Sequence, residues 1–111
     1  MQAIPVKRDT PAWRQRTSLD GTTFELDFAW NERESAWYLT VRDVEGEPLR
    51  GAIRLVIDWP LLRSWADQGR PAGELYFLDL EGTGSAPTFV DMGRRLQLVY
   101  VTAADRAELE G

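Results

Sequence analysis

Several carboxylates that lie near one another along the chain are the first candidates for catalytic chemistry. Asp58 and Asp67 flank a tryptophan-containing stretch, and Asp79, Glu81 and Asp91 flank a loop with two glycines. A glycosidase holds two carboxyl groups roughly 5–9 Å apart across a cleft, so that one acts as an acid and the other as a base or nucleophile. Because 18 of the 111 residues are acidic, such proximity arises by chance, and solvated surface carboxylates are the favoured interpretation.

The residue types that most enzymes depend on are missing from this sequence. It contains no histidine and no cysteine, which removes the usual general base near neutral pH, the thiolate nucleophile and the commonest metal ligands. The serines have no histidine to activate them. We therefore expect no enzyme, no metal site and no cofactor. A small carboxylate enzyme that uses Asp58 or Asp79 is a third-ranked hypothesis.

Five tryptophans in so short a chain are the second candidates for function. Trp30 and Trp37 continue the apolar faces of alternating segments, which predicts that they lie in the core. Trp13, Trp59 and Trp65 lie in weaker or irregular segments. They can cap the core or contact a partner, because aromatic residues are enriched in both settings. A carbohydrate-binding β module that uses these three tryptophans is the alternative function.

Alternation of apolar and polar residues predicts the elements that must position these side chains. An Asp20-Gly21 turn joins the first hairpin, because this dipeptide accepts positive φ. The pattern predicts strands over residues 2–6, 13–19, 22–31, 36–43, 49–57, 74–80 and 94–102. The segment 2–6 is expected at a sheet edge, since Pro5 cannot donate to a ladder. The fold class is mainly β: a small antiparallel β-barrel or sandwich of six to seven strands with one short helix.

Three further segments have distinct expectations. Residues 61–66 follow Pro60 and are predicted to form one or two helical turns. The strand 74–80 is apolar on both faces, which indicates a central position or a face against a partner. Residues 81–87 are expected to form a flexible surface loop.

Charge and hydropathy narrow the classes of partner. The net charge of −5 opposes nonspecific binding to nucleic acid. No apolar stretch is long enough to span a membrane, and the first residues lack the pattern of a signal peptide. Twelve of the 13 basic residues are arginine, which fits either interface use or a GC-rich genome. We expect one domain over 1–111, with an N-terminal edge segment at 1–11 and an acidic tail at 103–111.

A series of short motifs carries a family resemblance over residues 12–101. In order, they are Leu19-Asp20-Gly21, Asn31-Glu32-Arg33, Trp37-Tyr38-Leu39, Asp43 with Gly46 and Leu49, "GAIRLVIDWPLLR" (51–63), "GRPAGELYFLD" (69–79) and "DMGRRLQLVYV" (91–101). With these motifs the sequence resembles the small baseplate plug proteins of contractile-tailed phages, known from a cyanophage baseplate.

The resemblance implies a non-enzymatic part of the virion. Such a protein would be made in the host cytoplasm and would sit at the distal end of the tail tube with hub, tube and spike proteins, as a homo-oligomer around the tail axis. A stable assembly of this kind buries more than about 1,000 Å². The candidate contact residues are Trp13, Arg14, Arg16, Trp59, Arg63, Trp65 and Tyr76.

Overall fold

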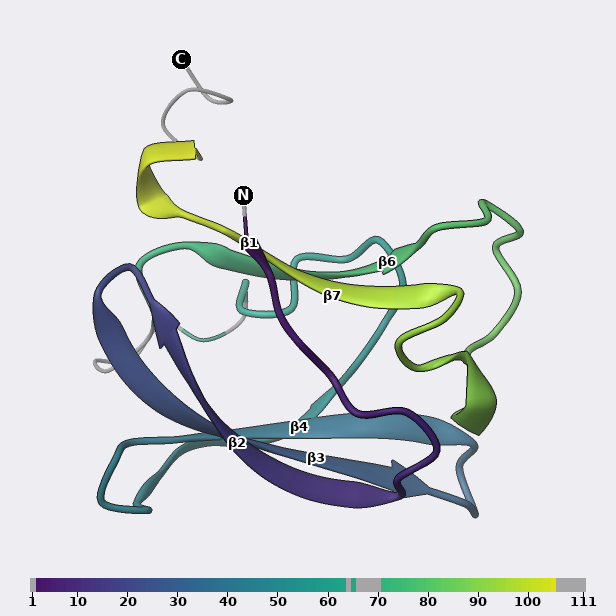
Figure 1. Cartoon of the computed structure of the whole chain (residues 1–111), viewed down its shortest axis with the longest axis horizontal. Helices are drawn as coiled ribbons and strands as arrows, with labels where there is room; N and C mark the ends of the chain where they lie inside the picture. The colour runs from purple at the N-terminus through teal and green to yellow at the C-terminus, as the bar shows by residue number, and fades with distance from the viewer. Residues whose placement is uncertain (1, 64, 66–70, 106–111) are drawn as a thin grey trace.

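The structure is a computed structural model that describes residues 2–63, 65 and 71–105 (Figure 1). Its strands are β1 (Gln2–Ala3), β2 (Ala12–Leu19), β3 (Thr22–Asn31), β4 (Ala36–Arg42), β5 (Pro48–Arg54), β6 (Glu74–Asp79) and β7 (Leu96–Val101), with a 3₁₀ turn at Phe89–Asp91. This confirms the expected mainly β fold of six to seven strands with one short helix.

The strands form two antiparallel sheets that pack face to face as a sandwich. One sheet has the order β2-β3-β4-β5 and the other the order β1-β7-β6. In Figure 1 the labelled strands β1, β6 and β7 lie in the upper layer, and β2, β3 and β4 lie in the lower layer. The four-stranded sheet is a meander, because tight turns join strands that are consecutive in the sequence.

The first hairpin forms as its turn dipeptide predicts. Asp20 and Gly21 have φ values of 52° and 81°, the positive values that a two-residue hairpin turn with the right twist requires. The turn pairs Leu19 with Thr22 and thereby sets the register of all eight pairs between β2 and β3. The predicted bounds of 22–31 for the second strand of this hairpin are confirmed.

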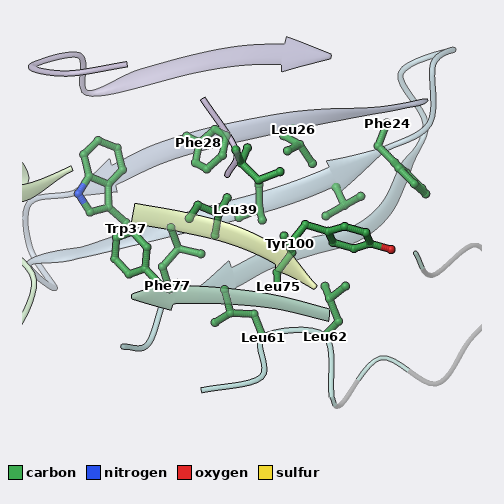
Figure 2. Close-up of a cluster of buried hydrophobic side chains, with 14 of the residues drawn as sticks. Phe24, Leu26, Phe28, Trp37, Leu39, Leu61, Leu62, Leu75, Phe77 and Tyr100 are labelled. Atoms are coloured by element: carbon green, nitrogen blue, oxygen red, sulfur yellow. The ribbon is translucent and has the colours of Figure 1, made fainter. Parts of the chain in front are cut away.

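Because apolar and polar residues alternate along each strand, one face of each strand packs into the core. Figure 2 shows this face, where side chains of the four-stranded sheet meet those of the other sheet: Phe24, Leu26, Phe28, Trp37 and Leu39 against Leu75, Phe77 and Tyr100. All of these side chains are buried. A fully buried aliphatic or aromatic side chain of this size contributes about 1.5–3 kcal/mol to folding.

Aromatic rings fill one end of the sandwich. Trp13 stacks on Phe28 with ring centroids 4.6 Å apart, and Trp37 stacks on Phe89 at 5.7 Å. Trp30 meets Trp37 edge to face at 5.5 Å. Trp37 therefore belongs to the core cluster, as the alternation predicted, whereas Trp30 is partly buried and packs against that cluster.

The strand 74–80 does not occupy the predicted central position. β6 is an edge strand that pairs with β7 alone among the named strands, and β7 is the central strand of its sheet. The two-sided apolarity arises differently, because Leu75 and Phe77 face the core while Tyr76 and Leu78 are half-buried on the other face. The second interpretation, a face against a partner, stays a prediction.

The described part of 61–66 forms turns and no helix. Arg63 N–H donates to Pro60 O at 3.2 Å and Trp65 N–H donates to Leu62 O at 3.0 Å, so the chain makes two successive i to i+3 turns. They carry Leu61, Leu62 and Trp65 onto the core. Residues 64 and 66 of this prediction lie outside the described residues.

The N-terminal strand is shorter than the predicted 2–6, since β1 covers only Gln2–Ala3. β1 lies at the edge of the three-stranded sheet, and Ile4 continues its ladder by donating to Leu98 O at 2.9 Å. In the predicted acidic tail, residues 103–105 are helical, and the remainder lies outside the described residues.

Candidate functional site

The structure separates the three tryptophans whose role the sequence left open. Trp13 is 8% exposed, Trp65 is 1% exposed, and Trp59 is 51% exposed. Trp13 and Trp65 thus contribute to the core, while Trp59 lies on the surface. Because two of the three rings are buried, the three tryptophans do not form an exposed platform for a carbohydrate.

Trp59 is part of a surface next to the edge strand β5 that combines apolar side chains with arginines. It lines a hollow together with Arg54, Val56 and Leu61, and Val56 is itself 44% exposed. The guanidinium of Arg63 lies 5.8 Å from the centre of the Trp59 ring, within the range of a cation–π contact. We name Arg54, Val56, Trp59 and Arg63 the β5 surface.

Sequence reasoning found Trp59 and Arg63 but missed Val56 and Arg54. The alternation of the segment 49–57 contained the signal. Ile53 and Leu55 face inward, so Arg54 and Val56 must share the outer face. An exposed valine beside an exposed tryptophan marks a candidate contact surface, because aromatic residues and arginine are enriched at interfaces.

Arg14 and Arg16 lie on the outer face of the four-stranded sheet, where each has a carboxylate partner. Arg14 Nε donates to Asp27 Oδ1 at 2.5 Å, and Arg16 Nε donates to Glu25 Oε1 at 3.3 Å. Arg42 approaches Asp27 from the other side at 2.6 Å. The hydrogen bond from Arg14, followed by that from Arg42, lowers the pKa of Asp27 despite its partial burial.

These ion pairs could have been read from the hairpin. A two-residue turn at 20–21 that pairs Leu19 with Thr22 also places Arg14 opposite Asp27 and Arg16 opposite Glu25. Cross-strand pairs of opposite charge stabilise a sheet by about 0.2–1 kcal/mol each. The two arginines therefore have a structural role already, and contact with a partner stays a prediction for both.

Tyr76, the remaining predicted contact residue, lies on the outer face of the three-stranded sheet. It pairs across the strands with Val99 and is half-buried. It is on a different sheet from Arg14 and Arg16, so the predicted contact residues do not form one continuous site.

Two of the candidate carboxylates are bound by one arginine. Arg95 donates to Asp79 Oδ2 at 2.9 Å and to Asp91 Oδ2 at 2.9 Å. Its guanidinium also donates to the carbonyl oxygens of Ser85 and Ala86 at 3.2 Å. Arg95 thereby ties the glycine-containing loop to the sheet, and the favoured interpretation of Asp79 as a solvated surface acid is wrong, because its side chain is only 2% exposed.

Both carboxylates are held in the ionised form. Burial by itself raises the pKa of Asp79, but backbone N–H groups of Gly84 and Glu81 donate to it and outweigh this effect, so its pKa is lowered. The hydrogen bond from Arg95 lowers the pKa of Asp91. A general acid needs a raised pKa near neutral pH, so this pair is unsuited to that role.

The lowered pKa of Asp79, which arises from the backbone N–H groups of Gly84 and Glu81 and to a smaller extent from Arg95, predicts a pH dependence of stability. Since the folded pKa of Asp79 lies below the unfolded value near 3.8, the stabilisation is present above that value and is lost as pH falls through the folded pKa. We expect Asp79→Asn to be less stable than wild type at pH 7, with the difference shrinking below about pH 4. Urea unfolding at pH 7, 4 and 3 measures it.

The exposed Glu45 on the β4–β5 turn provides the matched control. Glu45→Gln changes the net charge by the same amount as Asp79→Asn, but it removes a carboxylate that is exposed to solvent. The unfolding free energy of this variant should therefore stay within about 0.5 kcal/mol of wild type at each pH. A difference between Asp79→Asn and wild type that persists unchanged at pH 3 would contradict the assigned ion pairs.

Neither a cluster of potential metal ligands nor a membrane-spanning helix is found among the residues that the structure describes. Among residues 2–63, 65 and 71–105, the side chains of histidine, cysteine, aspartate and glutamate do not gather in groups of three that could hold a metal ion. Within the same residues, no helix has the length and apolar character needed to cross a bilayer.

The fold and this surface define a class: a small antiparallel β-sandwich protein with an exposed apolar and arginine-containing edge. Comparison with protein families then identifies the family. The family described as "Cyanophage baseplate Pam3 plug gp18" matches residues 1–103, and the chain belongs to it. A search of curated proteins finds no match.

Membership confirms the family that the ordered motifs indicated. It assigns the chain a structural role as a baseplate plug and implies a place in the tail baseplate of the virion, in association with other tail proteins. A structural plug also implies a protein that is not an enzyme.

Proposed function

We propose that this chain is a non-enzymatic plug or hub protein at the distal end of the phage tail tube, where it assembles with hub, tube and spike proteins. The family match over residues 1–103 carries this proposal. In it, the chain acts as one β domain over 1–111, requires no cofactor, and forms a homo-oligomer around the tail axis after synthesis in the host cytoplasm.

The surface of the sandwich supports a role in assembly. Exposed large apolar side chains remain after the core is filled: Val44, Val56, Trp59, Leu80 and Val90. An apolar side chain that stays in water gives up the stabilisation that burial provides, and contact with a partner would recover it. The charged outer face of the four-stranded sheet and the net charge of −5 favour protein partners over nucleic acid.

A catalytic function has less support than a role in assembly. The sequence lacks histidine and cysteine, and the two carboxylates that lie closest to a common site, Asp79 and Asp91, share Arg95 and are ionised. Of the remaining candidates, Asp58 is exposed and lies outside this cluster. The carbohydrate-binding alternative loses its platform, because Trp13 and Trp65 are buried.

Coexpression with the tail genes that flank its own gene tests the proposal. The tagged chain is expected to copurify with a hub, tube or spike protein, and native mass spectrometry is expected to find a discrete oligomer of the chain or a complex of fixed stoichiometry. A strictly monomeric chain that captures no tail protein would contradict the proposal. Zymography on cell walls provides the enzymatic control and is expected to show no clearing.

A further inference from the structure

Among the described residues, β5 is an edge strand of the four-stranded sheet. Residues that follow β5 cover the outer edge of β6, where Asp58 N–H donates to Phe77 O and Leu61 N–H donates to Leu75 O, both at 3.0 Å. On the opposite side, the Gln15 amide of β2 donates to Pro5 O at 2.7 Å and links that edge to the N-terminal segment. β5 pairs with β4 alone among the named strands, so no strand of the described residues lies along its outer edge.

The backbone of Arg54 points outward from this edge. Leu55 N–H donates to Trp37 O at 2.9 Å, and the same register pairs Ile53 with Leu39 and Arg54 with Tyr38. In an antiparallel ladder, hydrogen-bonded and non-hydrogen-bonded pairs alternate. Arg54 is therefore a non-hydrogen-bonded residue whose N–H and C=O groups face away from β4, where an added strand could pair with them.

Two adjoining hollows lie along this edge, and the charged side chains that line them are arginines. The two hollows share Arg54 and Val56, and Trp59 flanks one of them. Their described lining residues include arginines and no carboxylate, although 18 of the 111 residues are acidic. In a chain of net charge −5, this edge is complementary to an acidic partner.

A bulge shortens the edge that can pair. The ladder between β4 and β5 shifts register between Leu39 and Val41, and Ala52 opposite has a φ of 50°, a left-handed value that residues other than glycine rarely adopt. Ala52 N–H donates to the Thr40 hydroxyl at 3.3 Å rather than to a strand. Bulges protect sheet edges from indiscriminate pairing, so the available stretch is short, from Ile53 to Val56.

We propose that an extended, acidic segment of another tail protein binds at the β5 surface as an added strand of the four-stranded sheet. Its backbone pairs with the outward groups of Arg54, its apolar side chains cover Val56 and Trp59, and its carboxylates pair with the guanidinium groups of Arg54 and Arg63. Strand addition of this kind gains affinity from main-chain hydrogen bonds and specificity from side-chain contacts. The inference rests on the proposed function and names the partner's chemistry.

A second copy of this chain fits the edge less well. If two β5 edges paired around a two-fold axis, Arg54 would approach its own counterpart, and like charges opposite each other destabilise a sheet. Pairing with β2 of another copy would bring Arg54 toward Arg14 and Arg16 on the same outer face. A foreign segment that carries carboxylates avoids both repulsions.

Binding of the copurified tail protein to variants of the full chain tests the inference. Trp59→Ala and Arg54→Glu are expected to weaken binding by about 30-fold or more, as the loss of a central contact does, to leave the circular dichroism spectrum unchanged, and to cost less than about 1 kcal/mol in the free energy of unfolding. Lys7→Glu is the matched control, since it makes the same charge reversal as Arg54→Glu at an exposed residue of the N-terminal segment outside the β5 surface, and its affinity should stay within about twofold of wild type.

Amide hydrogen exchange distinguishes strand addition from other contacts. On binding, the Arg54 amide is expected to become protected, and overlapping peptides from the copurified protein are expected to bind only where they are acidic, with affinity that falls as salt rises. The inference would be overturned if Trp59→Ala and Arg54→Glu bound the tail protein with wild-type affinity. It would also be overturned if binding left the Arg54 amide unprotected. Neither result would contradict the proposed function. Capture of no tail protein by wild type would overturn the proposed function as well, and self-association through this edge would assign it to a second copy.

Discussion

Gly73→Ala is expected to destabilise the fold strongly. A Cβ at this position would lie inside van der Waals contact of the Val101 carbonyl oxygen and 2.7 Å from Cζ of Tyr100. Neither can move freely, because Val101 is backbone of the central strand β7 and the Tyr100 hydroxyl donates to Asp20 Oδ2 at 2.6 Å. Overpacking against backbone costs about 1–3 kcal/mol or more.

The same substitution also breaks a buried hydrogen bond. Gly73 N–H donates to the Tyr100 hydroxyl oxygen at 2.6 Å, and a buried group that loses its partner costs about 1–3 kcal/mol. Together the two effects predict a loss of about 4 kcal/mol in the free energy of unfolding, a large part of the 5–15 kcal/mol typical of a domain. Urea unfolding followed by circular dichroism measures the loss.

Gly51→Ala is the matched control for this prediction. No atom lies within 4 Å of a Cβ built at Gly51, so the variant should unfold within about 0.5 kcal/mol of wild type. If Gly73→Ala were as stable as Gly51→Ala, the close packing of Gly73 against β7 would be wrong.

Trp37→Ala is expected to cause the second large effect, a loss of about 3–5 kcal/mol. Trp37 is 1% exposed, and its ring contacts three others, Trp13, Trp30 and Phe89. Removal would leave a cavity at the aromatic end of the sandwich that the surrounding strands cannot fill by collapse. The midpoint of thermal unfolding should fall by roughly 10 °C or more.

Trp59→Ala separates core tryptophans from surface tryptophans. Because Trp59 is 51% exposed, its truncation should cost less than about 1 kcal/mol while it weakens binding to a tail protein. Trp37→Phe gives a further check, since it retains a ring in the aromatic cluster and should recover part of the loss. Equal destabilisation by Trp37→Ala and Trp59→Ala would contradict the division between core and surface.

This division answers why so small a β domain carries so many aromatic residues. Trp13, Trp37 and Trp65 complete a core that two small sheets enclose. Trp59 exceeds what the core requires, and it lies beside the outer edge of β5, with Val56 exposed on the same surface.

The sequence by itself determined the local features of this fold. Alternation identified the core faces of β3 and β4, and Asp20-Gly21 determined the first hairpin, because a two-residue turn pairs the strands on either side of it in a single register. The same register contained the pairing of Arg14 with Asp27. These features depend on residues close together in the chain, where backbone geometry leaves few choices.

Tertiary structure decided which segments are edges and which surfaces remain open. The apolar pattern of 74–80 fits a central strand as well as an edge strand. Only the tertiary structure, in which residues 57–61 rather than a further strand pack against β6, determines that this strand lies at an edge. The burial of Trp13 depends on contact with Phe28 of the neighbouring strand and Trp37 beyond it, whereas Trp59 finds no such cover among the described residues. Whether a side chain is buried depends on which distant residues of the chain pack against it. For this reason no local pattern distinguishes the exposed tryptophan from the buried ones.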